Sequence, residues 1–250
     1  MKKILAYFLS SLFYLCFGSL LVVFHLLQWI TFNTLGYSAH KFTLELLNFF
    51  ILKCHHILGT RIRFEYTSPL PTDRSLIFVG NHQSTYEIPP IIWHLRKHHP
   101  KFISKKELGK GIPSVSFNLR HGGSVLIDRN NPKNALKQIQ EFGEELQKKN
   151  YSAVIFPEGT RSRDGHLKKF QKSGLICLFK SMPNALVVPI SIGSSWRFGE
   201  HNYFPLPLGI KLHMTVHKPL EIDHQNTEKM IEQLEAFIKK EVHNRQKGKY

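Results

Sequence analysis

The N-terminal part of the chain contains its longest apolar stretch. No Asp, Glu, Lys or Arg occurs from Ile4 to His40, and residues 4–29 are predominantly apolar. A helix of this length can cross a hydrocarbon core of roughly 30 Å. Lys2 and Lys3 precede it, as in a signal peptide, but the stretch exceeds the usual signal core and no small-residue cleavage pattern follows promptly. We therefore expect a retained membrane segment.

A second apolar stretch, Lys41–Leu58, is interrupted by Glu45 and Lys53. Its uncharged centre is too short to span a bilayer, which favours an interfacial helix or the second arm of a hairpin. Residues 33–36 supply the break between the two helices. No internal repeat or low-complexity linker follows. The pattern predicts a pair of membrane-anchoring helices in residues 1–58 and one catalytic domain in residues 59–250.

After residue 60, short apolar runs alternate with amphipathic segments. The expected strands are Arg61–Tyr66, Leu76–Val79, Val125–Ile127, Ala153–Phe156, Leu186–Ile192 and Ile210–His217. Several are continuous apolar runs, typical of strands buried on both faces. Asn134–Lys149 and Thr227–His243 carry apolar residues at helical spacing. The alternation predicts an α/β fold, with a mixed, largely parallel sheet covered by helices. Pro189, inside an expected strand, favours an edge or irregular position there.

Composition adds a charge argument. The chain has 34 Lys and Arg against 18 Asp and Glu, a formal net charge of +16. Such an excess favours a polyanionic partner: nucleic acid, anionic lipid headgroups or phosphorylated substrates. The apolar N-terminus favours lipid, and a hairpin anchor would leave the basic domain on the cytoplasmic face, as basic segments prefer. The three cysteines are scattered without a CxxC pair, so neither a disulfide framework nor a thiolate metal site is indicated.

One histidine and one glutamate stand out as candidate catalytic groups. The expected strand at Leu76 is followed by Asn81-His82, and Glu87 comes five residues after the histidine. Within one regular helix these side chains would point about 140° apart. They can meet if His82 precedes a helix and Glu87 lies in its first turn. A carboxylate on one ring nitrogen leaves the other free as a general base. Taken alone, the pair is better explained by a helix cap and a solvated charge, because some such pair is expected by chance among 15 histidines.

Two further segments carry arginine at expected strand ends. Asp128-Arg129 follows the strand at Val125, where Arg could bind a phosphate or form a structural ion pair. The turn after Phe156 contains Glu158, Arg161 and Arg163, with three lysines close behind. This density of cations favours an anion site over an ordinary polar loop. Glu158 could accept from a substrate hydroxyl or organise the arginines.

Together these segments resemble the glycerolipid acyltransferase family, in particular its 1-acylglycerol-3-phosphate acyltransferases. Asn81-His82 with Glu87 is similar to the family's N-H-x4-D block, and Gly123 to Arg129 to its G-x-x-F-I-D-R block. Residues 156–162 match F-P-E-G-T-R-S, and residues 187–192 match V-x-P-I-x-I. The order of the blocks is also that of the family. Two positions depart from it: Glu87 replaces Asp, giving an H-x4-E motif, and Leu126 replaces an aromatic residue.

The resemblance implies direct acyl transfer without a covalent acyl-enzyme. His82, oriented by Glu87, would deprotonate the sn-2 hydroxyl of lysophosphatidic acid, which would attack an acyl-CoA or acyl-acyl carrier protein thioester. The same resemblance implies an acceptor site and pocket wall formed by Arg129, Glu158, Gly159, Thr160, Arg161 and Pro189. No metal or organic cofactor is required. The expected location is the bacterial inner membrane, with membrane phospholipids around the enzyme and the catalytic domain on the cytoplasmic face.

Two other classes of protein fit less well. A serine hydrolase is disfavoured because the sequence contains no G-x-S-x-G elbow. A membrane-tethered basic module that binds nucleic acid or anionic lipid would explain the charge and the anchor, but not the histidine–carboxylate pair followed by an E-G-T-R turn. We therefore expect an enzyme and no nucleic-acid partner. Another lyso-lipid acceptor remains an alternative within the family.

Overall fold

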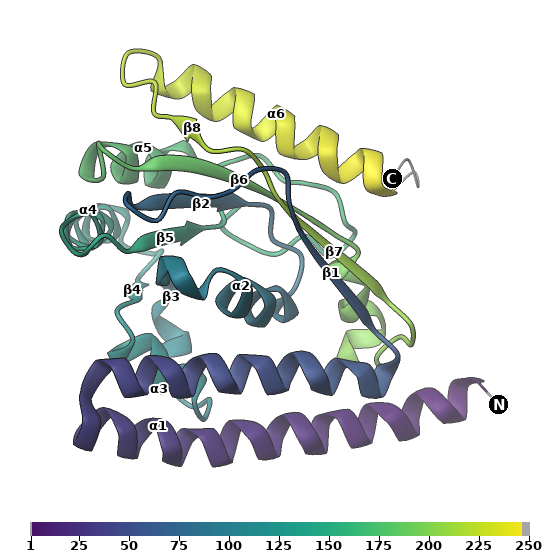
Figure 1. Cartoon of the computed structure of the whole chain (residues 1–250). Helices are drawn as coiled ribbons and strands as arrows, with labels where there is room; N and C mark the ends of the chain where they lie inside the picture. The colour runs from purple at the N-terminus through teal and green to yellow at the C-terminus, as the bar shows by residue number, and fades with distance from the viewer. Residues whose placement is uncertain (1, 247–250) are drawn as a thin grey trace.

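The N-terminal residues form a long helical hairpin along one side of the molecule (Figure 1). The computed structural model describes residues 2–246, and its first helix, α1, runs Lys2–Cys54 with a break at Gly36. Gly36 has φ 77° and ψ −166°, a conformation that is open to glycine and strained for other residues. A 3₁₀ turn, His55–Leu58, completes the hairpin. The predicted pair of helices and the break between them are confirmed.

The two arms of the hairpin pack on each other through apolar side chains. Leu21 and Phe24 of the first arm belong to one buried cluster with Leu47 and Ile51 of the second. The first arm nevertheless leaves many large apolar side chains exposed, among them Ile4, Phe8, Leu15, Val22, Leu26, Trp29 and Leu35. By length and composition α1 could cross a membrane. The division at residue 58 remains a prediction, because Phe13 also packs against Tyr86 and Phe198 of the following part of the chain.

The rest of the chain is built around an eight-stranded mixed sheet. Its strands are β1 (Arg61–Tyr66), β2 (Leu76–Gly80), β3 (Pro100–Lys105), β4 (Val125–Ile127), β5 (Ser152–Ile155), β6 (Leu186–Gly193), β7 (Lys211–Val216) and β8 (Leu220–Glu221). The order is β1-β7-β6-β2-β5-β3-β4, with β8 paired to β6. Among the strand pairs of residues 2–246, only β6–β7 and β6–β8 are antiparallel. The predicted mixed, largely parallel sheet is confirmed, and β3 and β8 are the two strands that were not predicted.

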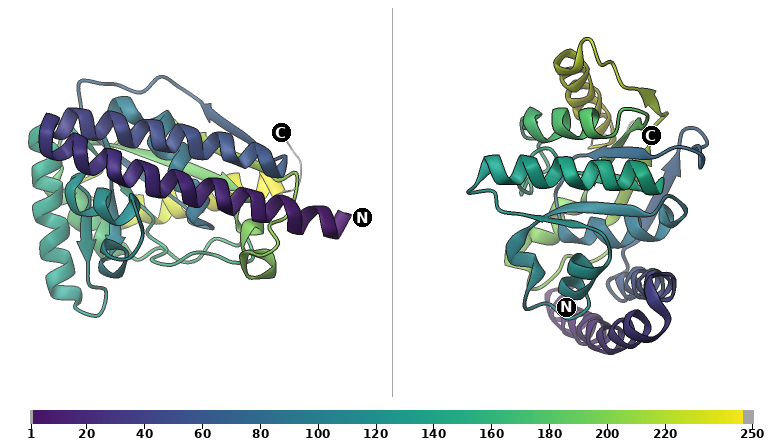
Figure 2. Two further views of the ribbon diagram at one scale, coloured as in Figure 1. Left: turned by 90° about the horizontal axis from the view of Figure 1, so that it is seen from below. Right: turned by 90° about the vertical axis from the view of Figure 1, so that its left-hand side faces the viewer.

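Helices cover both faces of this sheet (Figure 2). They are α2 (Ile88–His94), α3 (Val115–His121), α4 (Pro132–Lys149), α5 (Lys172–Ser181) and α6 (Thr227–Gln246). Short 3₁₀ helices lie at Thr85–Glu87, Arg96–His98, Lys106–Gly109 and Ser195–Tyr203. α4, α5 and α6 cover one face, and α2 lies between the other face and the hairpin (Figure 1). The α/β architecture with a helical N-terminal pair is therefore the predicted one.

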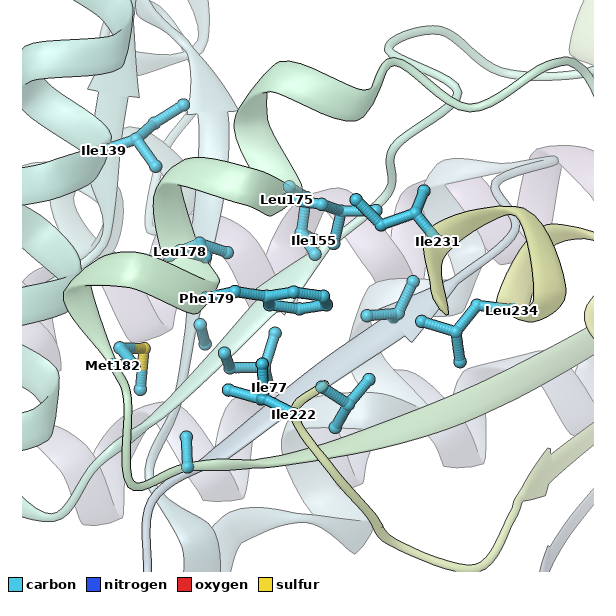
Figure 3. Close-up of a cluster of buried hydrophobic side chains, with 14 of the residues drawn as sticks. Ile77, Ile139, Ile155, Leu175, Leu178, Phe179, Met182, Ile222, Ile231 and Leu234 are labelled. Carbon is cyan, nitrogen blue, oxygen red and sulfur yellow. The ribbon is translucent and has the colours of Figure 1, made fainter. Parts of the chain in front are cut away.

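The two faces explain the continuous apolar runs of the central strands. In β2, Ile77 packs with Phe179 of α5 and other residues on the α4–α5–α6 side (Figure 3). Phe78, the next residue, belongs to the cluster on the α2 side together with Ile91. Because successive strand residues point to opposite faces, burial of both faces requires an apolar residue at every position.

Of the two positions expected for Pro189, an edge or an irregular one, the structure shows the irregular one. Pro189 lies in the interior of β6, which pairs with β2 on one side and with β7 and β8 on the other. Its carbonyl oxygen accepts the His217 N–H at 2.9 Å on that second side. A strand residue's nitrogen and carbonyl oxygen point the same way, so the missing N–H of Pro189 faces the junction between β7 and β8. Proline is tolerated there because the ladder is already interrupted.

Candidate active site

His82 and Glu87 meet at the carboxyl end of β2. His82 lies in the loop after the strand, and Glu87 ends the 3₁₀ turn Thr85–Glu87 that leads into α2. His82 Nδ1 lies 2.7 Å from Glu87 Oε2, and the side chains are 19% and 0% exposed. The histidine ring stacks on Phe156 at 4.3 Å between centroids. The predicted contact, with His82 before the helix and Glu87 in its first turn, is present, and Nε2 is left for another partner.

A dense set of donors holds the Glu87 carboxylate. Its Oε1 accepts the backbone N–H groups of Gln83 and Ser84, each at 2.8 Å. Ser84 also caps the turn by accepting from the Tyr86 N–H, which completes a capping box. The Ser195 hydroxyl donates to the same Oε1. With Oε1 occupied, Oε2 is directed to His82, and this fixes the orientation of the imidazole.

Glu158 binds backbone groups of two loops. Its Oε1 accepts the backbone N–H of His82 and its Oε2 that of Lys168, both at 2.7 Å. The side chain is buried and does not line the cavity described below. Burial raises the pKa of Glu158 to about 7, despite the two backbone hydrogen bonds. Both carboxylate oxygens therefore join the two loops in this structure, and the predicted contact of Glu158 with the acceptor stays a prediction.

A cavity of about 770 Å³ opens in front of His82. Four of the six residues predicted for the acceptor site line it: Arg129, Gly159, Thr160 and Arg161. Pro189 does not line this cavity, because it is buried within the sheet, and its place in a pocket wall stays a prediction. Most of the remaining lining is apolar and comes from the hairpin, α2, α3, β3 and α4.

The two arginines are held at the rim by the polypeptide itself. Arg129 donates to the carbonyl oxygen of Gly159, and this joins the end of β4 to the turn after β5. Gly159 has a φ of 70°, a left-handed conformation that suits glycine in this tight turn. Arg161 is exposed and lies 3.4 Å from the Tyr203 hydroxyl. The arrangement places two permanent cations beside a histidine base at the mouth of an apolar cavity.

Sequence reasoning missed the residues that support the pair from β6. Gln83 Oε1 accepts from the Ser195 N–H at 3.2 Å, and Asn81 exchanges hydrogen bonds with the backbone of Ile192 at 2.7 and 2.9 Å. Ser195 lies 108 positions after Glu87, so no local pattern connects them. A usable signal was nevertheless present: the sheet was predicted to be largely parallel, and polar residues directly after a parallel strand belong at the same sheet edge as His82.

Comparison with known proteins decides the family. The family model described as "Acyltransferase" matches residues 61–193, which is more than half of the chain and includes both His82 and Glu158. The chain belongs to the acyltransferase family.

The names of individual relatives of this acyltransferase also specify an acceptor. The 1-acyl-sn-glycerol-3-phosphate acyltransferase of Cocos nucifera is 30% identical over 182 residues, which cover 70% of this chain and 57% of the relative. That of Pseudomonas aeruginosa is 27% identical over 189 residues, covering 75% and 72%. Alignments with Limnanthes douglasii also span 57% of the relative. The chain thus spans little more than half the length of these plant proteins.

A solved structure supports the fold over nearly the whole chain. The 1-acyl-sn-glycerophosphate acyltransferase PlsC of Thermotoga maritima superposes with a TM-score of 0.80, covering 98% of both chains at 24% identity. The fold of this acyltransferase, hairpin included, is therefore shared with that protein. The apolar helix α1 and the bacterial and plant relatives together indicate association with a membrane.

Proposed function

We propose that this acyltransferase transfers a fatty acyl group from acyl-CoA or acyl-acyl carrier protein to the sn-2 hydroxyl of 1-acylglycerol-3-phosphate, giving phosphatidic acid for phospholipid synthesis. The observation that carries the proposal is the paired His82 and Glu87 facing a cavity with Arg129 and Arg161 at its rim. The names of the relatives support the same acceptor.

In the proposed reaction His82 acts first as a base. Its Nε2 takes the proton of the sn-2 hydroxyl while that oxygen attacks the thioester carbonyl carbon. The new C–O bond forms, the C–S bond breaks, and the imidazolium returns the proton to the departing thiolate. Glu87 stabilises the imidazolium through Nδ1 at 2.7 Å. We propose that no metal or organic cofactor takes part.

The acceptor and the acyl chain would occupy different parts of the cavity. A phosphomonoester carries close to two negative charges, and Arg129 and Arg161 offer planar guanidinium groups for it, next to Gly159 and Thr160. The apolar remainder suits a fatty acyl chain, since a volume of about 770 Å³ is within the range of pockets that enclose whole ligands. Ile92 and Phe102 are among the apolar residues there.

The hairpin would keep the catalytic part at the bilayer that supplies the lipid. We propose that it lies in one leaflet of the bacterial inner membrane, surrounded by phospholipids, with the catalytic part on the cytoplasmic face. The exposed side of the first arm is largely apolar, and two of its polar residues, Ser10 and Gln28, are buried. To test on which face of the membrane the catalytic part lies, single cysteines are introduced after residue 60 and treated with a membrane-impermeant reagent. Labelling from outside the cell would contradict it.

The decisive test of substrate is a competition assay. Purified enzyme in lipid vesicles is offered lysophosphatidic acid together with lysophosphatidylcholine and lysophosphatidylglycerol, with acyl-CoA and then with acyl-acyl carrier protein. We expect phosphatidic acid as the main product, identified by mass spectrometry with the new acyl chain at sn-2. Preferential acylation of another lyso-lipid would overturn the proposed acceptor while leaving the family intact.

A further inference from the structure

The segment from residue 105 to residue 113, which joins β3 to α3, lies against the middle of the hairpin. Ser114, directly after it, donates through its hydroxyl to the Leu21 carbonyl oxygen at 2.7 Å. The Ser114 N–H also donates to His25 Nδ1 at 3.2 Å. Val115 then packs into the apolar cluster shared by both arms. The end of this segment is therefore fixed to the first arm of α1.

The segment exposes both apolar and basic side chains. Leu108 and Ile112 are 39% and 37% exposed, and Lys105, Lys106 and Lys110 are exposed beside them. Lys106 is paired with Asp128. Within residues 2–246, neither Lys105 nor Lys110 has an ion-pair partner. Exposed aliphatic side chains flanked by unpaired lysines are typical of surfaces that contact anionic lipid headgroups.

This surface is continuous with the apolar side of the hairpin. Val22, Val23 and Leu26, the neighbours of Leu21 and His25 in the first arm, are 60%, 55% and 59% exposed. α3, which begins just after the segment, lies alongside the hairpin (Figure 1). A membrane that covers the first arm therefore reaches the segment as well.

We propose that residues 105–113 form a second membrane contact, in which Leu108 and Ile112 enter the boundary between headgroups and acyl chains while Lys105 and Lys110 bind anionic headgroups. This inference rests on the proposed position of the hairpin in the membrane. It assigns a partner to this surface, a bilayer with anionic phospholipids, and uses residues outside the catalytic pair.

The contact has a consequence for the substrate. Lys105, Leu108 and Ile112 also line the cavity that contains His82 and Arg161. If they meet the bilayer, the cavity opens at the level of the headgroups. A lyso-lipid could then move its phosphate toward the arginines while its acyl chain stays in apolar surroundings, which avoids the cost of exposing that chain to water.

Site-directed spin labelling tests the contact. Lys110 and Pro113 are suitable label sites because they are exposed and, unlike Ile112, do not line the cavity. Each is replaced by cysteine in full-length protein whose Cys16, Cys54 and Cys177 are alanine, after acyl transfer by this background has been verified. The labelled proteins are reconstituted in vesicles of phosphatidylethanolamine and phosphatidylglycerol. Leu26→Cys in the hairpin and Lys239→Cys on α6 are the matched controls.

Relative collision rates with oxygen and with a water-soluble nickel chelate then report depth. We expect the labels at 110 and 113 to have immersion depths between that of the label at 26, in the hydrocarbon, and that of the label at 239, in water. Lys110→Glu should shift the 113 label toward water, whereas Lys239→Glu should leave it unchanged. If the labels at 110 and 113 are as exposed to water as the label at 239, while the label at 26 lies in hydrocarbon, this inference alone is overturned. An aqueous label at 26 would overturn the hairpin position and this inference together.

Discussion

The backbone N–H of His82 donates to the carboxylate of Glu158 at 2.7 Å, although 76 positions separate the two residues. The His82 carbonyl oxygen in turn accepts the Ser162 N–H at 2.8 Å. The loop that carries the histidine is thus bound on both sides to the turn after β5. A carboxylate predicted to contact substrate joins the two loops between which the substrate would bind.

Glu158 should make stability depend on pH. Its pKa, raised by burial from 4.5 to about 7, means that the folded chain holds a proton that the unfolded chain releases. Since the folded state binds more protons between about pH 4.5 and 7, stability falls as pH rises through this window. We expect wild type to lose up to about 3 kcal/mol there relative to Glu158→Gln. Thermal unfolding of both proteins at several pH values measures this loss. Parallel plots of unfolding free energy against pH would contradict the raised pKa of Glu158.

Ser195 should affect catalysis through Glu87 without touching substrate. In Ser195→Ala the carboxylate loses a hydroxyl donor, and a hydrogen bond to a charged group contributes about 1.5–3 kcal/mol. We expect kcat to fall about 10- to 100-fold, with KM for the lyso-lipid changed far less. Ser191→Ala is the control, because Ser191 is equally buried in β6 but bonds His217. Equal losses in both variants would indicate a general effect on folding.

Arg161 should matter for binding of the acceptor phosphate. Arg161→Ala removes a cation from the cavity rim, and we expect KM for lysophosphatidic acid to rise roughly tenfold or more, with a smaller change in kcat. Arg163, two positions on, is exposed and does not line the cavity. Steady-state kinetics of Arg163→Ala should therefore match wild type. Similar KM values for both variants would remove Arg161 from the phosphate site.

Gly36 should be needed for the turn of the hairpin. With φ 77° and ψ −166°, an alanine there would be strained by about 1–3 kcal/mol. Gly18 lies inside the first arm with nothing within 4 Å of an added Cβ, so Gly18→Ala should stabilise the helix by about 0.5–1 kcal/mol. In detergent, the midpoint temperature of thermal unfolding should therefore fall for Gly36→Ala and rise for Gly18→Ala. A stabilising Gly36→Ala would contradict the turn geometry.

The sequence predicted the elements whose burial is uniform. β2, β5 and β6 are buried at nearly every position, so their apolar runs identify them directly. β3 was not predicted because its run contains Lys101. The Lys101 ammonium donates to Tyr37 Oη at 2.6 Å and lies over the Tyr151 ring. That burial depends on aromatic side chains from the hairpin and from the residue before β5, which no local pattern reveals.

The same reasoning applies to the candidate site. His82, Glu87 and the arginine turn are each encoded in a short segment, and their spacing sufficed to predict the contact of the first two. The hydrogen bonds of Glu158 to the two loops were not predicted, because an E-G-T-R turn does not disclose which way its carboxylate points. Ser195 and Gln83 were missed because they act across the edge of the sheet, where β6 ends beside β2.

The central claim is that His82 is the base in acyl transfer. His82→Ala and His224→Ala, the latter at an exposed histidine far along the sequence, should be purified and assayed with lysophosphatidic acid and acyl-CoA in vesicles. We expect His82→Ala to form phosphatidic acid at least about 100-fold more slowly while it remains folded at the assay temperature, and His224→Ala to match wild type. Phosphatidic acid formation by His82→Ala at the wild-type rate would contradict the account.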